Sequence, residues 1–150
     1  MPVELVTEPT AEISGAINAL LPQLSASASA LDEEQITALI AQDGMFLFIF
    51  RSEDTNAING MLSLATFTIP TGLRAWIEDV VVSEAARGQG AGRALIGEAV
   101  RFAEELGAKS VDLTSRPARE AANRLYRRCG FELRETNVYR YRESEIIDSL

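Results

Sequence analysis

The sequence predicts a mixed α/β fold, classed as α+β under some conventions, with about six or seven strands in one sheet and about four flanking helices. Three observations support this fold class. A β-branched strand, a glycine-rich loop and an amphipathic helix follow one another over residues 80–96. Apolar runs of strand length meet at short polar turns between residues 45 and 82. The chain has 150 residues, 47% of them hydrophobic, which suits a single domain over residues 1–150 with one core.

The N-terminal part of the chain predicts one short strand and two helices. Residues 3–7 are expected to form the strand, and residues 11–21 carry apolar side chains at helical spacing. Residues 25–30 alternate serine with alanine, which predicts a loop. The second helix is expected to begin at residues 31–34, Leu-Asp-Glu-Glu, because acids in a first turn complement the helix dipole.

The middle of the chain predicts three strands joined by tight turns. Residues 45–50 are all apolar, which is typical of a strand buried on both faces. A polar turn at residues 52–56 separates it from a strand over residues 58–69. Pro-Thr-Gly at residues 70–72 makes a second turn before a long strand over residues 73–82. Strands joined by such short turns pair antiparallel.

Past the glycine-rich loop, residues 92–106 predict a helix with one apolar face, and residues 111–114 predict a strand. That strand should lie parallel to the strand over residues 73–82, because a helix crosses over between the two. The hairpins are antiparallel, so the sheet is expected to be mixed.

The C-terminal part predicts one more helix and two strands. The helix should carry Pro117 in its first turn, where proline is tolerated, and should end at Gly130. Residues 131–134 and 138–141 then predict a final strand pair.

The loop before residue 92 has the composition of an anion site. Glycines at positions 88, 90 and 92 can expose their backbone N–H groups, and such groups at a helix N-terminus bind phosphate. The spacing is too short for a P-loop, and no Lys-Ser/Thr follows it. The dinucleotide fingerprint is incomplete, because Arg93 stands where its last glycine is required. The pattern that fits is Arg/Gln-x-x-Gly-x-Gly/Ala over residues 87–92; the alternative is a plain turn that opens a helix.

A second motif lies downstream. Residues 123–131, NRLYRRCGF, are similar to the pattern Asn-x-(Leu/Phe)-Tyr-x-x-x-Gly-Phe. With the loop over residues 87–92, this segment resembles the GNAT superfamily of acyl-CoA-dependent N-acetyltransferases, including uncharacterised bacterial members. The resemblance covers roughly residues 76–141, and the order of the predicted elements is the GNAT order.

The resemblance implies the GNAT fold, with a sheet splayed between the strand that ends at Val82 and the strand that starts near Val111. It also implies acetyl-CoA as co-substrate, with its pyrophosphate on the glycine-rich loop and its pantetheine arm paired with the upstream strand. Asn123 is expected to hydrogen-bond that arm. The implied cofactor-binding residues are Val80, Val81, Val82, Arg87, Gly88, Gln89, Gly90, Ala91, Gly92, Arg93 and Asn123. The valines are equally suited to ordinary core packing.

Tyr126 is the candidate acid for the leaving group, a role that the resemblance also implies. On a helical wheel, Ala121, Ala122, Leu125 and Cys129 define the core face and Tyr126 lies at its flank. A phenol with a pKa near 10 stays protonated at neutral pH and can donate to a thiolate. The alternative is an aromatic at the edge of the core with no chemical role.

Glu78 is the candidate base, and Asp79 is the second choice. Acids are disfavoured inside strands, so two together call for an explanation. In a regular strand Glu78 shares a face with Trp76 and Val80, opposite Asp79. An alkylammonium has a pKa of about 10.4, so the acceptor amine must lose a proton before it attacks. The alternative is an acid at the strand edge, paired with an arginine.

The expected reaction is transfer of an acetyl group to a primary amine by direct attack in a ternary complex. A non-catalytic module that senses acyl-CoA is the alternative. Residues 1–73 carry nine acids and one base. That imbalance suits a cationic amine of small-molecule or peptide type, although it also serves solubility. The acids at residues 32–34 also have two explanations: they belong to a site for the acceptor amine, or they stabilise the start of a helix.

The composition excludes other function classes. The absence of histidine rules out Ser-His-Asp and Cys-His mechanisms and removes the commonest zinc ligand, so no metal is expected. A net charge of −8 argues against a nucleic-acid partner. No apolar run approaches the roughly 20 residues that span a bilayer, so no membrane partner is expected. The lone Cys129, expected to pack as a small hydrophobe, suggests the cytoplasm. A homodimer stays open.

Overall fold

The computed structural model describes residues 2–142 of the chain. In chain order its elements are β1 (Val3–Leu5), α1 (Ala11–Leu24), α2 (Glu33–Ala41), β2 (Met45–Arg51), β3 (Ile58–Ile69), β4 (Gly72–Val82), the 3₁₀ turn η1 (Glu84–Ala86), α3 (Ala91–Glu105), β5 (Ser110–Asp112) and α4 (Glu120–Arg128). The predicted order of strands and helices is confirmed as far as α4.

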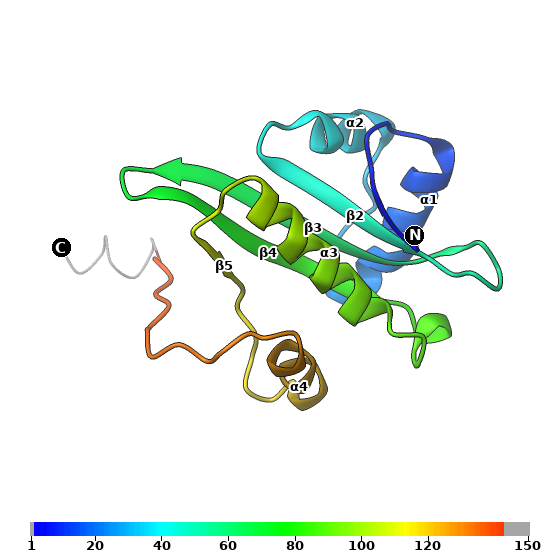
Figure 1. Cartoon of the computed structure of the whole chain (residues 1–150). Helices are drawn as coiled ribbons and strands as arrows, with labels where there is room; N and C mark the ends of the chain where they lie inside the picture. The colour runs from blue at the N-terminus through cyan, green and yellow to red at the C-terminus, as the bar shows by residue number, and fades with distance from the viewer. Residues whose placement is uncertain (1, 143–150) are drawn as a thin grey trace.

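The strands form one mixed sheet in the order β1-β2-β3-β4-β5. The pairs β1–β2, β2–β3 and β3–β4 are antiparallel, whereas β4 and β5 are parallel. In Figure 1, α3 crosses one face of the sheet, and α1 and α2 lie against the other. The mixed fold and the parallel pair on either side of the crossover helix are therefore confirmed.

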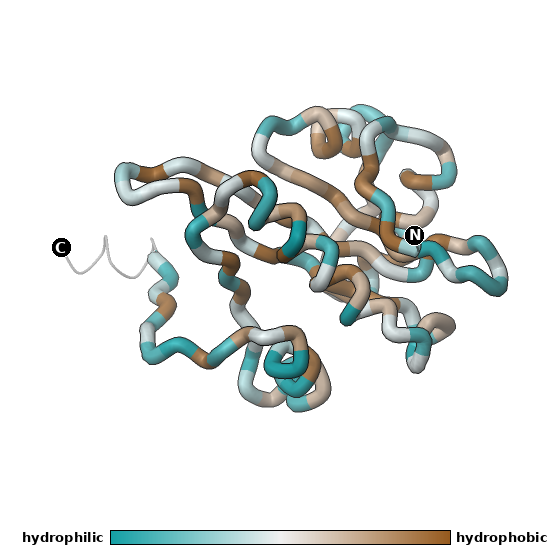
Figure 2. The backbone as a smooth tube through the Cα atoms, viewed as in Figure 1, coloured by the Kyte–Doolittle hydropathy of each residue, from teal (hydrophilic) through white to brown (hydrophobic). Residues whose placement is uncertain are grey.

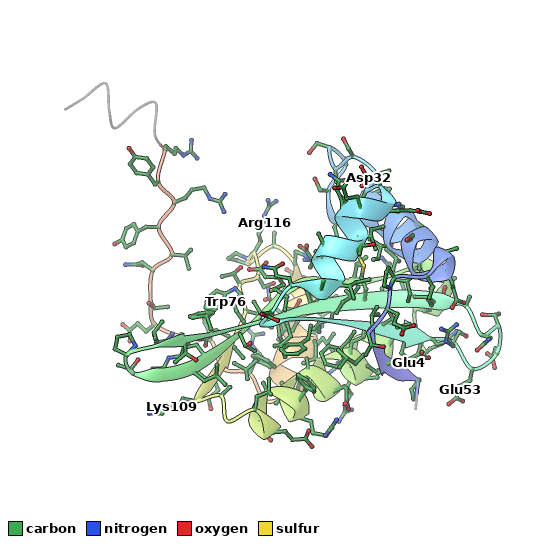
Figure 3. The ribbon with its side chains drawn as sticks, turned by 90° about the horizontal axis from the view of Figure 1, so that it is seen from above. Glu4, Asp32, Glu53, Trp76, Lys109 and Arg116 are labelled. Atoms are coloured by element: carbon green, nitrogen blue, oxygen red, sulfur yellow. The ribbon has the colours of Figure 1, made fainter. Side chains whose placement is uncertain are left out.

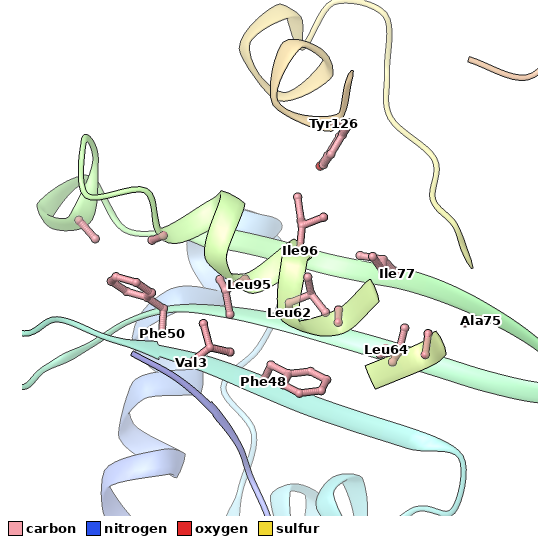
Figure 4. Packing of buried hydrophobic residues seen from close by; sticks show 14 residues of the cluster. Val3, Phe48, Phe50, Leu62, Leu64, Ala75, Ile77, Leu95, Ile96 and Tyr126 are labelled. Atoms are coloured by element: carbon pink, nitrogen blue, oxygen red, sulfur yellow. The ribbon is translucent and has the colours of Figure 1, made fainter. Parts of the chain in front are cut away.

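The hydrophobic core lies in two layers, one on each face of the sheet. The α3 layer includes Phe48 and Leu64, and the α1/α2 layer includes Leu47 and Ile49. Successive residues of a strand face opposite sides, so the continuous apolar run of β2 fills both layers, as predicted for residues 45–50. Figure 2 shows hydrophobic residues following the central strands, and Figure 4 shows the α3 layer at close range.

Side-chain caps set the beginnings of the first two helices. The Thr10 side chain accepts a hydrogen bond from the Ile13 N–H, at 3.1 Å, ahead of α1. Asp32 and Gln35 form a capping box ahead of α2, each side chain bonding the backbone N–H of the other residue. The acids at residues 32–34 therefore have a structural role at the start of α2.

Two local predictions at the C-terminal side are wrong. Pro117 lies in a turn that precedes α4, closed by the Arg119 N–H donating to the Arg116 carbonyl at 3.0 Å. Residues 131–134 and 138–141 form no strand, since no described residue pairs with them and a strand needs a neighbour for its hydrogen bonds. The described sheet accordingly has five strands.

A β-bulge interrupts the pairing of β3 with β4. The register shifts between Met61 and Ser63, so that Leu62 lies opposite two residues of β4, Asp79 and Val80. Asp79 has a φ of 51°, in the left-handed region that aspartate tolerates better than most residues. β4 therefore carries one residue more than β3 at this point.

The bulge changes which side chains share a face of β4. Ile77 and Val80 both pack in the α3 layer, although in a regular strand they would point to opposite sides. Val81 packs in the α1/α2 layer. Glu78, next to Ile77, therefore faces the α1/α2 side together with Trp76, which Figure 3 shows on that face. The prediction that Glu78 and Val80 share a face of the strand is wrong, because the extra residue reverses the alternation of side chains between the two faces.

The sheet splays between β4 and β5. Residues 74–76 pair with residues 110–112, and no later residue of β4 pairs with β5. β4 continues to Val82, whereas the chain after β5 turns away towards α4 (Figure 1). Within residues 2–142, the outer edge of β4 beyond Trp76 therefore has no strand beside it, and the expected splay is confirmed.

In the described part of the chain, no helix has both the length and the apolar character needed to cross a bilayer. The same residues contain no group of three or more His, Cys, Asp or Glu side chains arranged for a metal ion. The cytoplasmic location, the single domain and the absence of a metal stay predictions.

Candidate active site

The glycine loop, residues 87–93, connects η1 to α3. Gly88 and Gly90 have φ values of 84° and 74°, in the region where any residue with a Cβ is strained. An added Cβ at either position would have no heavy atom within 4 Å, so crowding does not explain the glycines. The backbone conformation of the loop requires them.

The loop presents a row of free backbone donors. Arg87 and Gln89 use their N–H groups within the loop, donating to the carbonyls of Glu84 and Ala86 at 3.2 Å each. Within residues 2–142, five other N–H groups have no intramolecular acceptor: those of Gly88, Gly90, Ala91, Gly92 and Arg93. The first turn of α3 holds no acid that would repel an anion. The donors and the positive end of the helix dipole together suit a diphosphate.

Gly92 has a different reason to be glycine. A Cβ at this position would lie 2.8 Å from Cδ2 of Leu125 on α4. The first turn of α3 therefore approaches α4 closely, which brings the glycine loop beside the helix that carries the second motif.

Arginines surround the loop and α4. Within the described residues, none of the following forms an ion pair: Arg87, Arg93, Arg116, Arg119, Arg124, Arg127 and Arg128. By contrast, Arg51 and Arg101 each bond two glutamates. Guanidinium groups without a carboxylate partner are suited to phosphate, so the charge around the loop fits an anionic ligand with several phosphates.

Tyr126 is the buried residue of α4, 9% exposed, and it packs in the α3 layer. Figure 4 shows its side chain directed from α4 towards Ile96 of α3. The predicted position at the flank of the core face is wrong, and Ala121, expected in the core, is exposed. A helical wheel fixes the angles between side chains but not the roll of the helix, which here follows the contact of Leu125 with Gly92.

Burial also sets the protonation of two groups on α4. It raises the pKa of the Tyr126 phenol, and the charge of Arg119 opposes part of that shift. The phenol is therefore protonated at neutral pH and is available as a donor. Burial likewise raises the pKa of the Cys129 thiol, opposed by Arg93, and a protonated thiol is a poor nucleophile.

The end of α4 holds Tyr126 in place through a Schellman motif. The Phe131 N–H donates to the Tyr126 carbonyl at 3.0 Å, and the Gly130 N–H donates to the Arg127 carbonyl at 3.1 Å. Gly130 has a φ of 96°, as this motif requires. The ring of Phe131 contacts that of Tyr126 edge-on, with centroids 6.3 Å apart. Phe131 thus limits the orientation of the phenol, a contact that the wheel does not reveal.

Asn123 holds the loop between β5 and α4. Its Nδ2 donates to the Arg116 carbonyl at 3.0 Å and contacts the Pro117 carbonyl at 3.5 Å. The amide donor is therefore engaged within the chain. The predicted bond to the pantetheine arm stays a prediction, and the structure gives Asn123 a positioning role in this loop.

Glu78 lies on the opposite side of β4 from Tyr126. Its carboxylate is exposed and accepts a hydrogen bond from Nε1 of Trp76 at 2.8 Å. Within residues 2–142 neither Glu78 nor Asp79 forms an ion pair, so the alternative of an acid paired with arginine finds no support. Trp76 orients the carboxylate, and the sequence signal for this contact is the two-residue spacing that places both side chains on one face of the strand.

Two buried hydroxyls complete the site. The Oγ atoms of Ser83, directly after β4, and Ser115, in the loop after β5, are buried without a hydrogen-bond partner among the described residues. The two serines follow the two strands that splay apart. Buried polar atoms are normally paired, so these two are natural contacts for a polar ligand.

Of the predicted site residues, the structure thus brings together the glycine loop, Val80, Val82 and Tyr126 on the α3 side of the sheet. Val81 and Glu78 lie on the α1/α2 side, and the open edge of β4 separates the two groups.

The comparisons agree with this architecture. The sequence matches the acetyltransferase (GNAT) family over residues 16–131. No curated protein matches the chain. Among solved structures, a Trypanosoma brucei acetyltransferase is 26% identical with a TM-score of 0.74, and the match covers 93% of this chain and 99% of that one.

Two further structures share the fold at lower identity. An aminoglycoside acetyltransferase from an uncultured soil metagenomic sample is 23% identical with a TM-score of 0.81, over 93% of both chains. Glucosamine-6-phosphate N-acetyltransferase from Arabidopsis thaliana is 18% identical with a TM-score of 0.76, over 94% of this chain and 99% of that chain. Since the family match spans most of the sequence and the fold agrees, the chain belongs to the acetyltransferase (GNAT) family and is an acyltransferase.

Proposed function

We propose that this protein transfers an acetyl group from acetyl-CoA to a primary amine by direct attack within a ternary complex. One observation carries the proposal: the free N–H groups of the glycine loop lie directly after the strand whose outer edge is open. Backbone donors suit a diphosphate, and an open strand edge suits an extended chain of amides. Acetyl-CoA presents both groups in this order.

The chain's residues fit that molecule at three points. The loop donors and the unpaired arginines would hold the phosphates, and the backbone of residues 80–82 would pair with the pantetheine arm. The unpartnered hydroxyls of Ser83 and Ser115 offer polar contacts beside the arm. Bound acetyl-CoA supplies a thioester whose carbonyl carbon is open to attack.

The remaining chemistry belongs to side chains on the two faces of β4. A carbon–nitrogen bond forms and the carbon–sulfur bond breaks. Glu78, held by Trp76, takes the amine proton directly or through water. On the other side, Tyr126 donates a hydrogen bond to the sulfur as negative charge develops. Because burial raises the phenol's pKa, Tyr126 keeps its proton, and the thiolate takes its own from solvent.

The charge distribution favours a cationic acceptor. Residues 1–73 carry nine acids and one base, and that base, Arg51, is paired with Glu4 and Glu12. Glu78 and Asp79 add two exposed carboxylates on β4. Two structural neighbours are named for amino-sugar acceptors. Aminoglycosides, polyamines and amino sugars are therefore the first acceptors to test, and an anionic sugar phosphate should be the poorest of them.

The test combines thiol release over this amine panel with one variant. Tyr126→Phe should leave the Kd for acetyl-CoA unchanged and reduce kcat by about 100-fold, the low end of the effect of removing one hydrogen-bond donor to a developing charge. Tyr139→Phe is the control, since the Tyr139 side chain is 87% exposed. Equal rates for Tyr126→Phe and the unmodified protein would remove Tyr126 from the mechanism.

Binding alone would give a different pattern. Acetyl-CoA that binds to the glycine loop but releases no thiol with any amine would indicate the acyl-CoA-sensing alternative. That outcome would overturn the proposed transfer while preserving the cofactor site.

A further inference from the structure

The face of the sheet that carries α1 and α2 is only partly covered by them. On β2, Leu47 packs in the α1/α2 layer, but Met45, two residues earlier on the same face, does not. Met45 pairs with Ala65 of β3, and Ala65 pairs with Trp76 of β4. Within residues 2–142 these three side chains are partly exposed and belong to neither core layer. They form an open apolar surface beside Glu78, the candidate base.

Two exposed apolar residues extend this surface along β3. Phe67 is 45% exposed and Ile69 is 40% exposed. Both share the face of Ala65, because they follow it at intervals of two residues along the strand. A contiguous apolar surface that is left in solvent marks a place where a ligand or another chain binds. Its position beside Glu78 favours the acceptor as that ligand.

Two carboxylates border Trp76 on this face. Glu78 lies two residues farther along β4 and accepts a hydrogen bond from Nε1 of the indole at 2.8 Å. Asp112 is the register partner of Trp76 on β5. Because Val111 and Leu113 pack in the α3 layer, Asp112 between them faces the side of Trp76. The indole therefore lies next to both carboxylates.

Neither carboxylate is neutralised by an ion pair within residues 2–142. Arg74 is the only cation of β4 and faces the same side, but its Nη2 donates to Oγ1 of Thr71 at 2.8 Å, in the turn between β3 and β4. Glu78 and Asp112 are one strand and two residues apart, which separates their Cα atoms by about 8 Å in a regular sheet. The face of an indole also attracts cations. Two carboxylates on either side of an indole suit a ligand with two cationic groups joined by a hydrocarbon chain.

We propose that the acceptor is an aliphatic diamine or polyamine that binds across Trp76, with its reacting amine at Glu78 and a second ammonium group at Asp112. The hydrocarbon chain between the two nitrogens lies on the indole and the open apolar surface. This inference rests on the proposed function, since Glu78 is the proposed base, and it narrows the acceptors to amines with a second cationic group. Asp112 is then a specificity-determining residue that binds the acceptor and takes no part in proton transfer.

The first test uses Trp76 itself, because it is the only tryptophan of the chain and its fluorescence reports on this surface without any chemistry. With coenzyme A present, 1,5-diaminopentane should change the emission saturably. Pentylamine, which has the same carbon chain and one nitrogen, should bind about tenfold more weakly, because it lacks the charge-assisted hydrogen bond to Asp112. Asp112→Asn should remove most of this difference.

Glu104→Gln is the matched control for the loss of one negative charge. Glu104 is an exposed acid of α3, on the other face of the sheet, and has no ion pair among the described residues. This variant should keep the preference for the diamine. Equal affinity for the two amines, or an unchanged preference in Asp112→Asn, would overturn the proposal. An emission maximum that shifts when the protein alone is diluted would show that a second copy covers the surface, which also contradicts it.

The second test separates this inference from the proposed function by steady-state kinetics. With acetyl-CoA, kcat/KM should be about tenfold higher for 1,5-diaminopentane than for pentylamine, and Asp112→Asn should lower the value for the diamine mainly by raising KM. Thiol release with equal kcat/KM for both amines would overturn the second ammonium site and leave acetyl transfer standing. Diamine binding that is weakened in Asp112→Asn, without thiol release from any amine, would overturn the transfer and leave the diamine site standing.

Discussion

On the side of the sheet formed by β1, β2 and β3, neighbouring strands pair along their lengths, whereas β4 loses its outer neighbour after Trp76. The helices differ in the same way. α1 and α2 each start with a side-chain cap that accepts from one N–H group of the first turn, while α3 starts with a glycine and free donors. The closed region thus supplies stability, and the open region keeps backbone groups available for a ligand.

The charges follow the same division. Arg51, the base of the first 73 residues, bonds Glu4 and Glu12, which lowers the pKa of Glu12. The arginines around α4 have no such partners among the described residues. The absence of ion pairs at these arginines costs little stability, because exposed ion pairs contribute little to the free energy of unfolding. Its arginines stay available for the anionic ligand that we propose.

The largest expected difference between the two regions is in stability. Leu64→Ala, in the closed region at 0% exposure, should lower the free energy of unfolding by about 2–5 kcal/mol. Leu113→Ala, next to the splay and only partly buried, should lower the free energy of unfolding by clearly less. Urea denaturation at one fixed protein concentration measures both. Equal costs would show that the core extends undiminished into the splayed region.

The next difference concerns the glycines of α3 and its loop. Gly90→Ala forces a Cβ into the left-handed region at a cost of about 1–2 kcal/mol, so the loop should change shape and the Kd for acetyl-CoA should rise about tenfold. Gly97→Ala is the matched control, because Gly97 lies in the middle of α3 with open space around it. It should leave binding unchanged and stabilise the helix by roughly 0.5–1 kcal/mol. Isothermal titration calorimetry measures both constants, and an unchanged Kd in Gly90→Ala would contradict the role of the loop.

The smallest expected effect is on stability in alkaline solution. Burial raises the pKa of Tyr126 in the folded state, so the folded chain keeps the phenol's proton after the unfolded chain has lost it. This contribution is fully present below the unfolded pKa of about 10 and is lost as pH rises through the folded value. Tyr126→Phe should therefore reduce the fall in stability above that pH. The measurement is urea denaturation across the alkaline range, with Tyr139→Phe as the control.

The sequence predicts those features that depend on local spacing. The glycine loop is predictable because its backbone conformation requires glycines at positions 88 and 90, where φ is positive, and because the glycine at position 92 continues the pattern. The two-layer burial of β2 is predictable because its apolar run is continuous. The bulge at Asp79 is not, since it depends on how β4 registers against β3.

The features that the sequence misses involve partners far along the chain. The roll of α4 depends on the contact between Leu125 and Gly92, so the wheel misplaces Tyr126 and Ala121. Residues 131–134 and 138–141 have the alternation of strands, but alternation alone does not supply a neighbouring strand, and none of the described strands pairs with them. The hydroxyls of Ser83 and Ser115 attract notice only once both are seen to be buried and unpartnered.

The bulge in β4 makes the length of residues 78–80 matter more than their identity. Removing one residue there would restore regular pleating and carry either the carboxylate or the valines through the plane of the sheet. The proposed base and the proposed cofactor-binding residues would then compete for one surface. Insertions and deletions at this point are thus a sharper criterion than substitutions for deciding which related chains share its chemistry.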